Sequence, residues 1–327
     1  MSESGWQAEA RPGTDRDGFD LRVVPAVLLE VIRLAGDDET SVAELSEAIM
    51  KDGALSARTL SLANSSFFGR RRNVDTVDEA LVTIGMQNAH TCVVTGALMQ
   101  ALGSKKSEVI DMRAFWQESL LRACIARAMS ERVDEGLRHQ AYLAALLADL
   151  AVPILANEDA AYAEAVRDVH CCQASIAELE KGDATPNHAA RASRLCQAWG
   201  LPSSLQGPIA SHHEPPPTEP TGDRETRLWQ IAFVAGNLPL ARLGDLDAST
   251  LELAAECFAM DVDLVSQAIE RGIESYGALT EVFAPVLPED SHVGEILEVA
   301  RSLSRLRDCD LSDGELESES VLRDAAH

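Results

Sequence analysis

Of the side chains in this sequence, those of three histidines are best suited to metal binding or acid–base chemistry. His212 and His213 are adjacent in the segment Ile209-Ala210-Ser211-His212-His213-Glu214, and His188 lies upstream. Neighbouring residues on a helix point about 100° apart, so a histidine pair alone rarely shares one metal ion. A cluster that includes His188 could bind one. Two other interpretations stay open: the pair could bond the last carbonyls of a helix, or a histidine could be buried and hydrogen-bonded between lobes.

A run of three arginines forms a second candidate site. It follows the segment Asn64-Ser65-Ser66-Phe67-Phe68-Gly69, which is typical of a helix end followed by a tight turn. Guanidinium groups suit phosphate, nucleotide or carboxylate partners. The alternative is a solvated loop that balances nearby acidic residues, with phenylalanines that serve only packing. The predicted binding residues are Arg70, Arg71 and Arg72, together with Asn64 and Phe67.

Motifs for other chemistry are missing from the sequence. It contains no P-loop, no Gly-x-Gly-x-x-Gly, no His-Glu-x-x-His and no Gly-x-Ser-x-Gly. The seven cysteines include no Cys-x-x-Cys pair. Adjacent Cys171 and Cys172 could form a redox pair, but reduced and buried thiols are the expectation for a long chain with scattered cysteines. We therefore expect no cofactor.

The elements that position these residues are predicted to be helices. Ala and Leu dominate the apolar residues and aromatic residues make up only 4% of the chain, which favours helices over strands. Trp116 is expected in a helical core, because Phe115, Ser119 and Leu120 follow helical spacing around it. Capping side chains and glycines locate the ends of helices. The predicted starts are the capping boxes Ser41–Glu44 and Thr76–Glu79, Asp52, and Thr185–Pro186, and the predicted stops are Gly85 and Gly200.

The predicted fold is all-α, with a small N-terminal helical lobe and a larger C-terminal helical lobe. A polar linker, 104–107, separates the two lobes. The predicted division is a flexible N-terminal arm over 1–20, the N-terminal lobe over 21–103, the larger lobe over 108–284, and a partly disordered C-terminal helix and acidic tail over 285–327.

Charge excludes several kinds of partner. The chain carries 28 basic and 53 acidic residues, for a formal net charge of −25. Such a surface repels nucleic acids and anionic membranes. The sequence shows neither an apolar run of about 18 residues nor a signal peptide. We expect a cytoplasmic protein that binds neither nucleic acid nor membrane.

Motifs spread over residues 21–283 occur in an order and spacing typical of one family. The most specific is Ala-Asn-Ser-x-Phe-x-Gly at 63–69. This pattern resembles the HDOD domain, a bacterial signalling module related to HD-type phosphohydrolases. The resemblance implies an HDOD-like helical fold whose larger lobe is HD-like. The other motifs are Val24–Val27, Met50–Arg58, Ala80–Gly85, Phe115–Ser119, Gly200–Pro202 and His212–Glu214.

The resemblance also identifies the places of a metal-ligand set. HD-type phosphohydrolases hold metal with a histidine, a later His-Asp pair and a late aspartate, and a bound water becomes the nucleophile. The matching places here hold Glu118, the pair Ala148-Asp149, and Gly236. Only Asp149 is retained, and a lone carboxylate cannot hold a catalytic metal. Asp149 is instead expected to cap the turn at Pro153, and no metal is expected at this set.

The resemblance therefore implies a non-catalytic HDOD signalling or regulatory protein. It would act by protein–protein or small-ligand binding, with a protein partner in a bacterial signalling pathway. The alternative is a divergent HD-type metal-dependent phosphohydrolase, which would act on a nucleotide or cyclic dinucleotide through Asp149, His188, His212 and His213. A third hypothesis, nucleic-acid binding through the arginine run, is disfavoured by the acidic charge.

Overall fold

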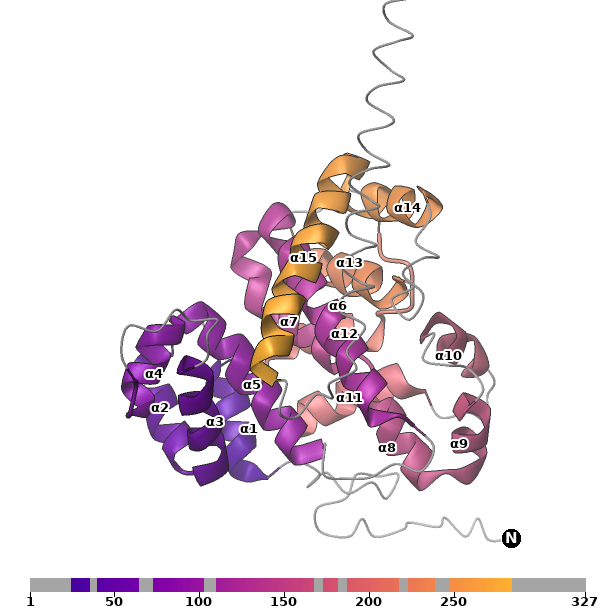
Figure 1. The fold of residues 1–327 in the computed structure, drawn as a ribbon. Coiled ribbons are helices and arrows are strands. Elements are labelled where there is room, and N and C mark those ends of the chain that lie inside the picture. The colour runs from indigo at the N-terminus through magenta and orange to yellow at the C-terminus, as the bar shows by residue number, and fades with distance from the viewer. Residues whose placement is uncertain are drawn as a thin grey trace, which may run out of the picture.

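The computed structural model describes most of the chain as helices. No strand occurs in the part of the chain that it describes, which confirms the all-α prediction (Figure 1). Several predicted features lie outside these residues: the N-terminal arm, Phe67 with the arginine run, the Cys171–Cys172 pair and the C-terminal tail. The described ranges are 25–35, 40–64, 73–102, 110–167, 173–181, 187–217, 223–238 and 248–283.

The N-terminal lobe is a packed group of helices at one side of the molecule (Figure 1). Helix α1 packs against α5, α2 packs against α4, and α3 contacts both α4 and α5. Their apolar faces enclose a core that includes Leu28, Ile32 and Leu45. The helices are α1 (Ala26–Ala35), α2 (Val42–Met50), α3 (Gly53–Ala63), α4 (Val77–Ile84) and α5 (Met86–Leu102).

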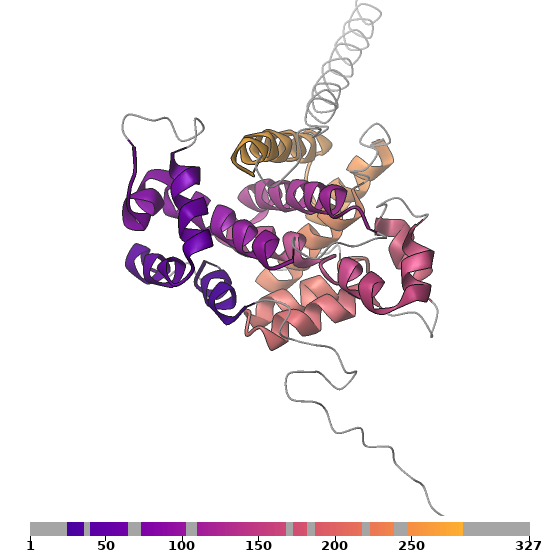
Figure 2. The ribbon, with the colours of Figure 1, turned by 60° about the horizontal axis from the view of Figure 1, so that its bottom comes forward.

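The larger lobe is built around the long helix α6 (Met112–Val133). This helix packs against α7, α13 and α15, so it is covered on several sides. Helices α9 and α10 lie on the side of the lobe away from α1–α4 (Figures 1 and 2). The other elements are η3 (Glu135–Leu137), α7 (Arg138–Leu147), α8 (Ala151–Glu158), α9 (Ala160–Arg167), α10 (Gln173–Leu179), α11 (His188–Ala198), η4 (Ser203–Leu205), α12 (Gln206–Ala210), α13 (Arg224–Asn237), α14 (Ala248–Phe258) and α15 (Val262–Phe283).

Helices α6 and α15 approach unusually closely at one glycine. A Cβ atom on Gly272 would lie 2.5 Å from the Cα of Ile125, a distance that real atoms do not tolerate. Glycine is therefore the residue that allows α15 to pack directly on the backbone of α6. The two helices run side by side in both views (Figures 1 and 2).

Most helix ends follow the local signals in the sequence. Ser41 and Glu44 form the predicted capping box, Thr76 accepts from the N–H of Glu79, and Asp52 caps α3. The backbones of Gly85 and Gly200 adopt φ values of +79° and +69°, which favour glycine at a helix end. The predicted start at Thr185–Pro186 was wrong: α11 begins at His188, because Asn187 accepts from the N–H of Ala190 and caps it.

One helical stretch, 135–158, is long and apolar enough to span a membrane by length and composition alone. It comprises η3, α7 and α8, and 89% of its most apolar window is buried inside the protein. That degree of burial is typical of a core helix, so this stretch gives little support for a membrane span.

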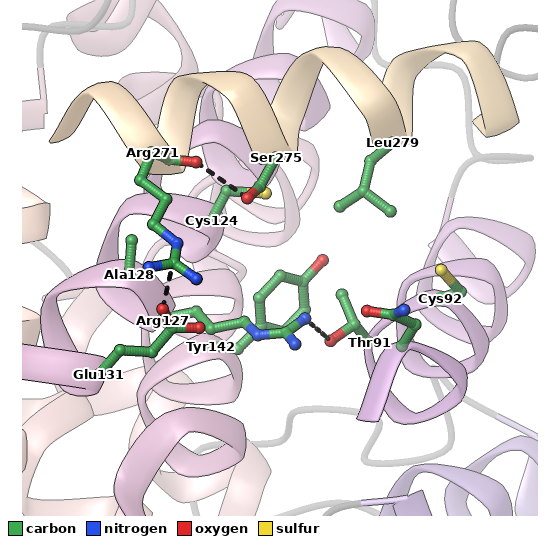
Figure 3. A pocket seen from close by; sticks show the side chains of 11 residues that line it. Thr91, Cys92, Cys124, Arg127, Ala128, Glu131, Tyr142, Arg271, Ser275 and Leu279 are labelled. Carbon is green, nitrogen blue, oxygen red and sulfur yellow. Dashed lines mark hydrogen bonds and ion pairs between the residues drawn. The ribbon is translucent and has the colours of Figure 1, made fainter. Parts of the chain in front are cut away.

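The two lobes meet at α5, where polar contacts line a small cavity (Figure 3). Arg127 on α6 donates to Thr91 on α5 at 3.2 Å, and the hydroxyls of Thr95 and Tyr142 lie 2.7 Å apart. The cavity beside these contacts has a volume of about 210 Å³, and α15 contributes Arg271 and Ser275 to its wall. The lobe junction thus contains a cavity lined by both polar and apolar side chains.

Burial of Trp116 yields a stability prediction. Its side chain is 3% exposed and packs edge-on against Phe115, as its helical spacing indicated. Trp116→Ala should lower the free energy of unfolding by about 3–5 kcal/mol, measured by urea denaturation. Trp116→Phe should cost less than half as much, because the indole N–H has no partner among the described residues. An unchanged midpoint for the alanine variant would contradict this burial.

Candidate functional site

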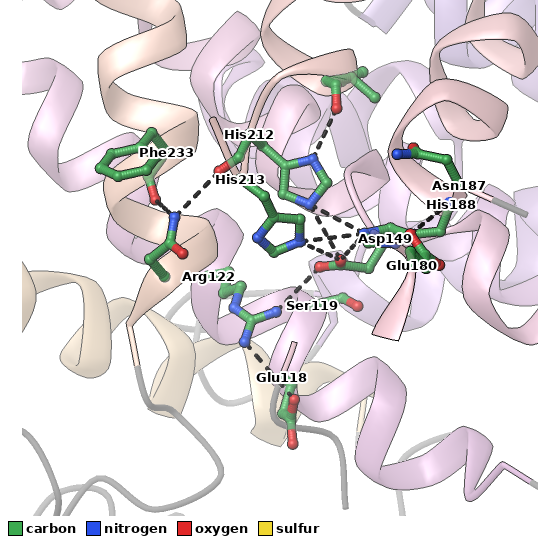
Figure 4. Close-up of polar contacts among 12 residues, drawn as sticks. Glu118, Ser119, Arg122, Asp149, Glu180, Asn187, His188, His212, His213 and Phe233 are labelled. Carbon is green, nitrogen blue, oxygen red and sulfur yellow. Dashed lines mark hydrogen bonds and ion pairs between the residues drawn. The ribbon is translucent and has the colours of Figure 1, made fainter. Parts of the chain in front are cut away.

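Asp149 lies at the centre of a buried polar network in the larger lobe (Figure 4). It occupies the turn between α7 and α8 and is 1% exposed. Arg122 on α6 donates from Nη1 to its Oδ2 at 3.1 Å. Its other oxygen, Oδ1, lies 3.2 Å from His188 Nε2 and 3.3 Å from His212 Nε2. The predicted capping role was wrong, because α8 has no side-chain cap and the carboxylate is taken up by these contacts.

The three histidines converge on this carboxylate, which the sequence had left open. His188 Nε2 lies 3.4 Å from His212 Nε2 and 3.2 Å from His213 Nε2. His213 Nε2 lies 4.0 Å from Asp149 Oδ1. Asp149, His188, His212 and His213 are called the histidine–aspartate cluster below. One donor atom from each lies within 4.8 Å of the others, so the cluster could hold a metal ion.

The end of α12 explains how two adjacent histidines face the same point. The helix stops at Ala210, and Ser211 has φ −114° and ψ 16°, so His212 and His213 lie in a turn. The spacing of 100° per residue, on which the sequence argument relied, does not apply there. His212 Nδ1 also donates to the carbonyl of Ile209 at 2.7 Å, which is the predicted bond to a helix-end carbonyl.

Glu180 fixes His188 from the other side, and sequence reasoning missed it. Its Oε2 accepts from the backbone N–H of His188 at 3.0 Å and lies 2.6 Å from Nδ1 of the same residue. Its Oε1 accepts from the hydroxyl of Tyr162 at 2.6 Å. Nothing in the local sequence marks Glu180, because it follows α10 and reaches the site only through the packing of the lobe.

Burial and close charges shift the ionisation of the cluster in opposite directions. Burial opposes ionisation of Asp149, but hydrogen bonds from His188 and His212 and the charge of Arg122 hold its pKa well below the usual range. Burial also disfavours charge on His188, yet its bonds to Asp149 and Glu180 raise its pKa to about 9. Burial, together with the electrostatic effect of the adjacent imidazole of His212, lowers the pKa of His213 to about 2. The pKa values of neighbouring groups in the cluster are therefore shifted in opposite directions.

The HD-type ligand set does not fit a metal in this chain. Ala148 and Gly236 offer no donor atom, and the carboxylate of Glu118 faces Arg122, with 3.9 Å between Oε2 and Nη2. Gly236 also gives room to a histidine: a Cβ there would lie 3.0 Å from Cδ2 of His212. Gly236, at the place of the late aspartate, thus leaves room for the side chain of His212.

Asn64, the described member of the predicted arginine site, has bonds within the N-terminal lobe. Its Nδ2 donates to the carbonyls of Leu60 at 2.9 Å and Val74 at 2.8 Å, and its Oδ1 accepts from the N–H of Val74 at 2.9 Å. The side chain therefore ties the end of α3 to the segment before α4. Its binding role, with Phe67 and the arginine run, stays a prediction.

Comparison with known proteins identifies the family. Residues 21–215, more than half of the chain, match the HDOD domain. The chain belongs to the HDOD family. No curated protein matched the sequence.

Solved structures share the fold at low sequence identity. A candidate phosphohydrolase from Shewanella amazonensis SB2B gives a TM-score of 0.59 at 22% identity, covering 78% of this chain and 94% of its own. An HDOD domain protein of unknown function from Geobacter sulfurreducens gives 0.61 at 19%, covering 80% and 93%. A candidate signal transduction protein from Marinobacter aquaeolei VT8 gives 0.61 at 19%, covering 80% and 58%. These structures confirm an HDOD-like helical fold.

Crowding at Gly236 yields a second stability prediction. Replacing glycine by alanine within a helix ordinarily gains up to about 1 kcal/mol. Gly236→Ala should instead lose about 1–3 kcal/mol, because the new methyl group presses on His212. The matched control is Gly53→Ala at the first residue of α3, where a Cβ would meet nothing within 4 Å. Equal stability of the two variants in thermal unfolding would contradict the predicted contact.

Glu118 yields a prediction about pH. Burial raises its pKa from 4.5 to about 7, against the opposing charge of Arg122. The folded protein then keeps a proton that the unfolded chain releases, so its stabilising contribution is present below pH 4.5 and lost as pH rises through 7. Between pH 5 and pH 8 the wild type should lose about 2–3 kcal/mol of unfolding free energy relative to Glu118→Gln. Parallel urea-denaturation profiles for the two proteins would show that Glu118 is not perturbed.

Proposed function

We propose that this chain is a non-catalytic HDOD regulatory protein that acts by binding a protein partner or a small ligand. The supporting observation is the Arg122–Asp149 ion pair, with 3.1 Å between Nη1 and Oδ2. It lies where the resemblance places the metal ligands of HD-type phosphohydrolases. A guanidinium group supplies positive charge, but it has no coordination position for water and cannot generate a metal-bound nucleophile.

Burial of the histidine–aspartate cluster supports the same proposal. The side chains of Asp149, His188 and His212 are at most 2% exposed, and His213 is 12% exposed. A phosphohydrolase must bring a charged phosphate ester to within bonding distance of its nucleophile. The donor atoms here face one another across distances of 3.2–4.0 Å, which leaves no room for such a substrate between them.

The cavity at the lobe junction is the proposed place for a small ligand. Its wall contains Arg127 from α6 and Arg271 from α15, together with Thr91 from α5 and Tyr142 from α7 (Figure 3). A ligand there would contact both lobes, so binding would affect how α5 packs on the larger lobe. Arg127 favours a small anionic molecule, whereas Arg271 is already paired with Glu131 of the same wall, with 3.3 Å between Nε and Oε2.

The partner is proposed to be a protein of a bacterial signalling pathway, met in the cytoplasm. The net charge of −25 supports a partner other than nucleic acid or an anionic membrane. The solved structures with this fold carry names of both kinds, signal transduction protein and phosphohydrolase, so their names do not choose between the candidate functions.

The second candidate is a divergent metal-dependent phosphohydrolase that uses the histidine–aspartate cluster. The convergence of four donor atoms within 4.8 Å favours it. It would require the buried cluster to open and admit a nucleotide or cyclic dinucleotide.

A hydrolysis assay separates the two candidates. Purified protein with Mg²⁺, Mn²⁺, Fe²⁺ or Zn²⁺ is expected to release no more product from nucleotides and cyclic dinucleotides than the matched variant Asp149→Asn. The reason is that Arg122 occupies Oδ2 of Asp149, the one carboxylate retained from the HD-type ligand set, and that the cluster is buried. Metal-stimulated turnover in the wild type that Asp149→Asn abolishes would establish the phosphohydrolase instead.

A further inference from the structure

The cavity at the lobe junction has a buried floor and an exposed rim (Figure 3). Its floor is made by side chains that are at most 4% exposed, those of Thr91, Cys92, Cys124 and Tyr142. Its wall also contains the exposed residues Asn88 on α5, and Arg271 and Ser275 on α15. The cavity therefore reaches solvent at α5 and α15, and a small molecule can enter it there.

Arg127 brings a positive charge to this cavity. Its Nη1 donates to the Thr91 hydroxyl at 3.2 Å, and it forms no ion pair with a carboxylate in the part of the chain that the structure describes. The other two charged side chains of the wall, Arg271 and Glu131, are paired with each other, with 3.3 Å between Nε and Oε2. The wall thus has a net charge of +1, although the whole chain has a net charge of −25.

The thiols and the phenol of the floor do not balance this charge. Burial raises the pKa values of Cys92 and Cys124 to about 12, against the opposing effect of the Arg127 charge. Burial also raises the pKa of Tyr142 well above its usual range. All three groups are therefore neutral near pH 7. A partly buried guanidinium group is left without a negative partner there, and a bound anion would supply one.

The volume of the cavity limits the size of that anion. A cavity of about 150 Å³ binds benzene, so the 210 Å³ found here suits a molecule of roughly eight to ten non-hydrogen atoms. Pockets for drug-sized ligands measure about 300–1,000 Å³. A nucleotide or a cyclic dinucleotide, with base, sugar and phosphate groups, is therefore too large to be enclosed.

The remainder of the wall suits an apolar group. Ala128 and Leu279 contribute aliphatic side chains, and Tyr142 contributes an aromatic ring. Buried cysteines such as Cys92 and Cys124 behave as small apolar residues, and their sulfur atoms make favourable contacts with aromatic rings. A ligand with one charged end and an apolar body therefore matches this wall better than a free phosphate ion does.

We propose that this cavity binds a small organic monocarboxylate with a compact apolar body. The inference rests on the proposed function, because it names the class of small ligand for the same cavity. A monoanion balances the charge of Arg127, whereas a phosphate dianion would leave excess negative charge near Glu131. The planar donor fork of a guanidinium group also matches the two oxygens of a carboxylate.

Binding would change how the two lobes are joined. The Arg127–Thr91 bond links α6 to α5, and a carboxylate at the same guanidinium group competes with the threonine hydroxyl. The hydroxyls of Thr95 and Tyr142, 2.7 Å apart, link α5 to α7 beside it. The ligand thus exchanges one bond between the lobes for its own contacts with both, which gives a small molecule control over the docking of the N-terminal lobe.

Titration calorimetry of the full chain tests the proposal. The probes are benzoate and cyclohexanecarboxylate, and the matched control is benzamide, which has the shape of benzoate without its charge. The carboxylates are expected to bind with Kd of about 0.1–1 mM, typical of ligands this small. Benzamide and inorganic phosphate should bind at least about tenfold more weakly.

Thermal unfolding provides a second measurement of the same binding. Benzoate at about 10 mM should raise the melting temperature by about 2–6 °C, because it binds the folded state. Sodium chloride at equal ionic strength should not reproduce this shift.

Matched variants locate the ligand. Arg127→Met should weaken benzoate binding at least about tenfold, because it removes the charge and keeps an apolar side chain. The control is Arg132→Met on the same helix, which alters an exposed arginine outside the wall and should bind as the wild type does. Ala128→Leu should also weaken binding, because it fills the cavity. Where Arg127→Met fails to fold, Arg127→Lys replaces it and should weaken binding through loss of the donor fork.

Each outcome decides for or against the site. Failure of both carboxylates to bind the folded wild type would overturn it, as would equal binding of benzoate and benzamide or equal binding by the wild type and the folded Arg127 variant. Failure of binding together with absence of hydrolysis would leave the regulatory proposal to act through a protein partner. Carboxylate binding together with metal-stimulated hydrolysis of nucleotides supports the site and refutes only the non-catalytic proposal.

Discussion

The larger lobe depends on how the buried carboxylate of Asp149 is neutralised. An ionised carboxyl with 1% exposure is strongly destabilising unless opposite charges and hydrogen bonds surround it. Arg122 satisfies one oxygen and the histidines face the other. These contacts join α6, the α7–α8 turn, the start of α11 and the turn after α12. The packing of these helices and the ionisation of Asp149 therefore depend on each other. Loss of one partner of Asp149 would leave its buried charge uncompensated.

Two glycines allow the close contacts between helices and side chains on which this arrangement around Asp149 depends. Gly272 lets α15 lie on the backbone of α6, which carries Arg122. Gly236 leaves space on α13 for the ring of His212, where the resemblance would place an aspartate in HD-type phosphohydrolases. Glycine at this place thus offers no metal ligand and leaves room for the imidazole of His212. An HDOD fold can in this way keep its helices while the chemistry at its centre changes.

The resemblance and the structure lead to different interpretations of the same residues. Taken one at a time, Glu118, Ala148, Asp149 and Gly236 describe a site that has lost its ligands. In three dimensions the retained carboxylate faces three histidines, His188, His212 and His213, that lie outside those four places. The side chains at these four places alone therefore do not describe the polar centre of the larger lobe, whose buried cluster is compatible with the proposed regulatory function.

Local interactions were predictable from sequence because each involves residues a few positions apart. The Ser41–Glu44 capping box, the Asp52 cap and the left-handed glycines at 85 and 200 depend only on backbone geometry within one turn. The all-α fold and the burial of Trp116 follow from composition and helical period. The same reasoning failed at Thr185, where a neighbouring asparagine supplied the cap instead.

The cluster was decided only by tertiary structure. Asp149 and His212 are 63 residues apart, and His188 and His212 are 24 apart. Whether their side chains meet depends on where α12 ends and on how α11 packs against α8 and α12. The helical spacing of apolar residues in the sequence indicates neither. No pattern in the sequence indicated Glu180, because its contact with His188 depends on where the folded chain places the end of α10. Sequence determined the helices and the donor types available, and packing determined which donors share one point in space.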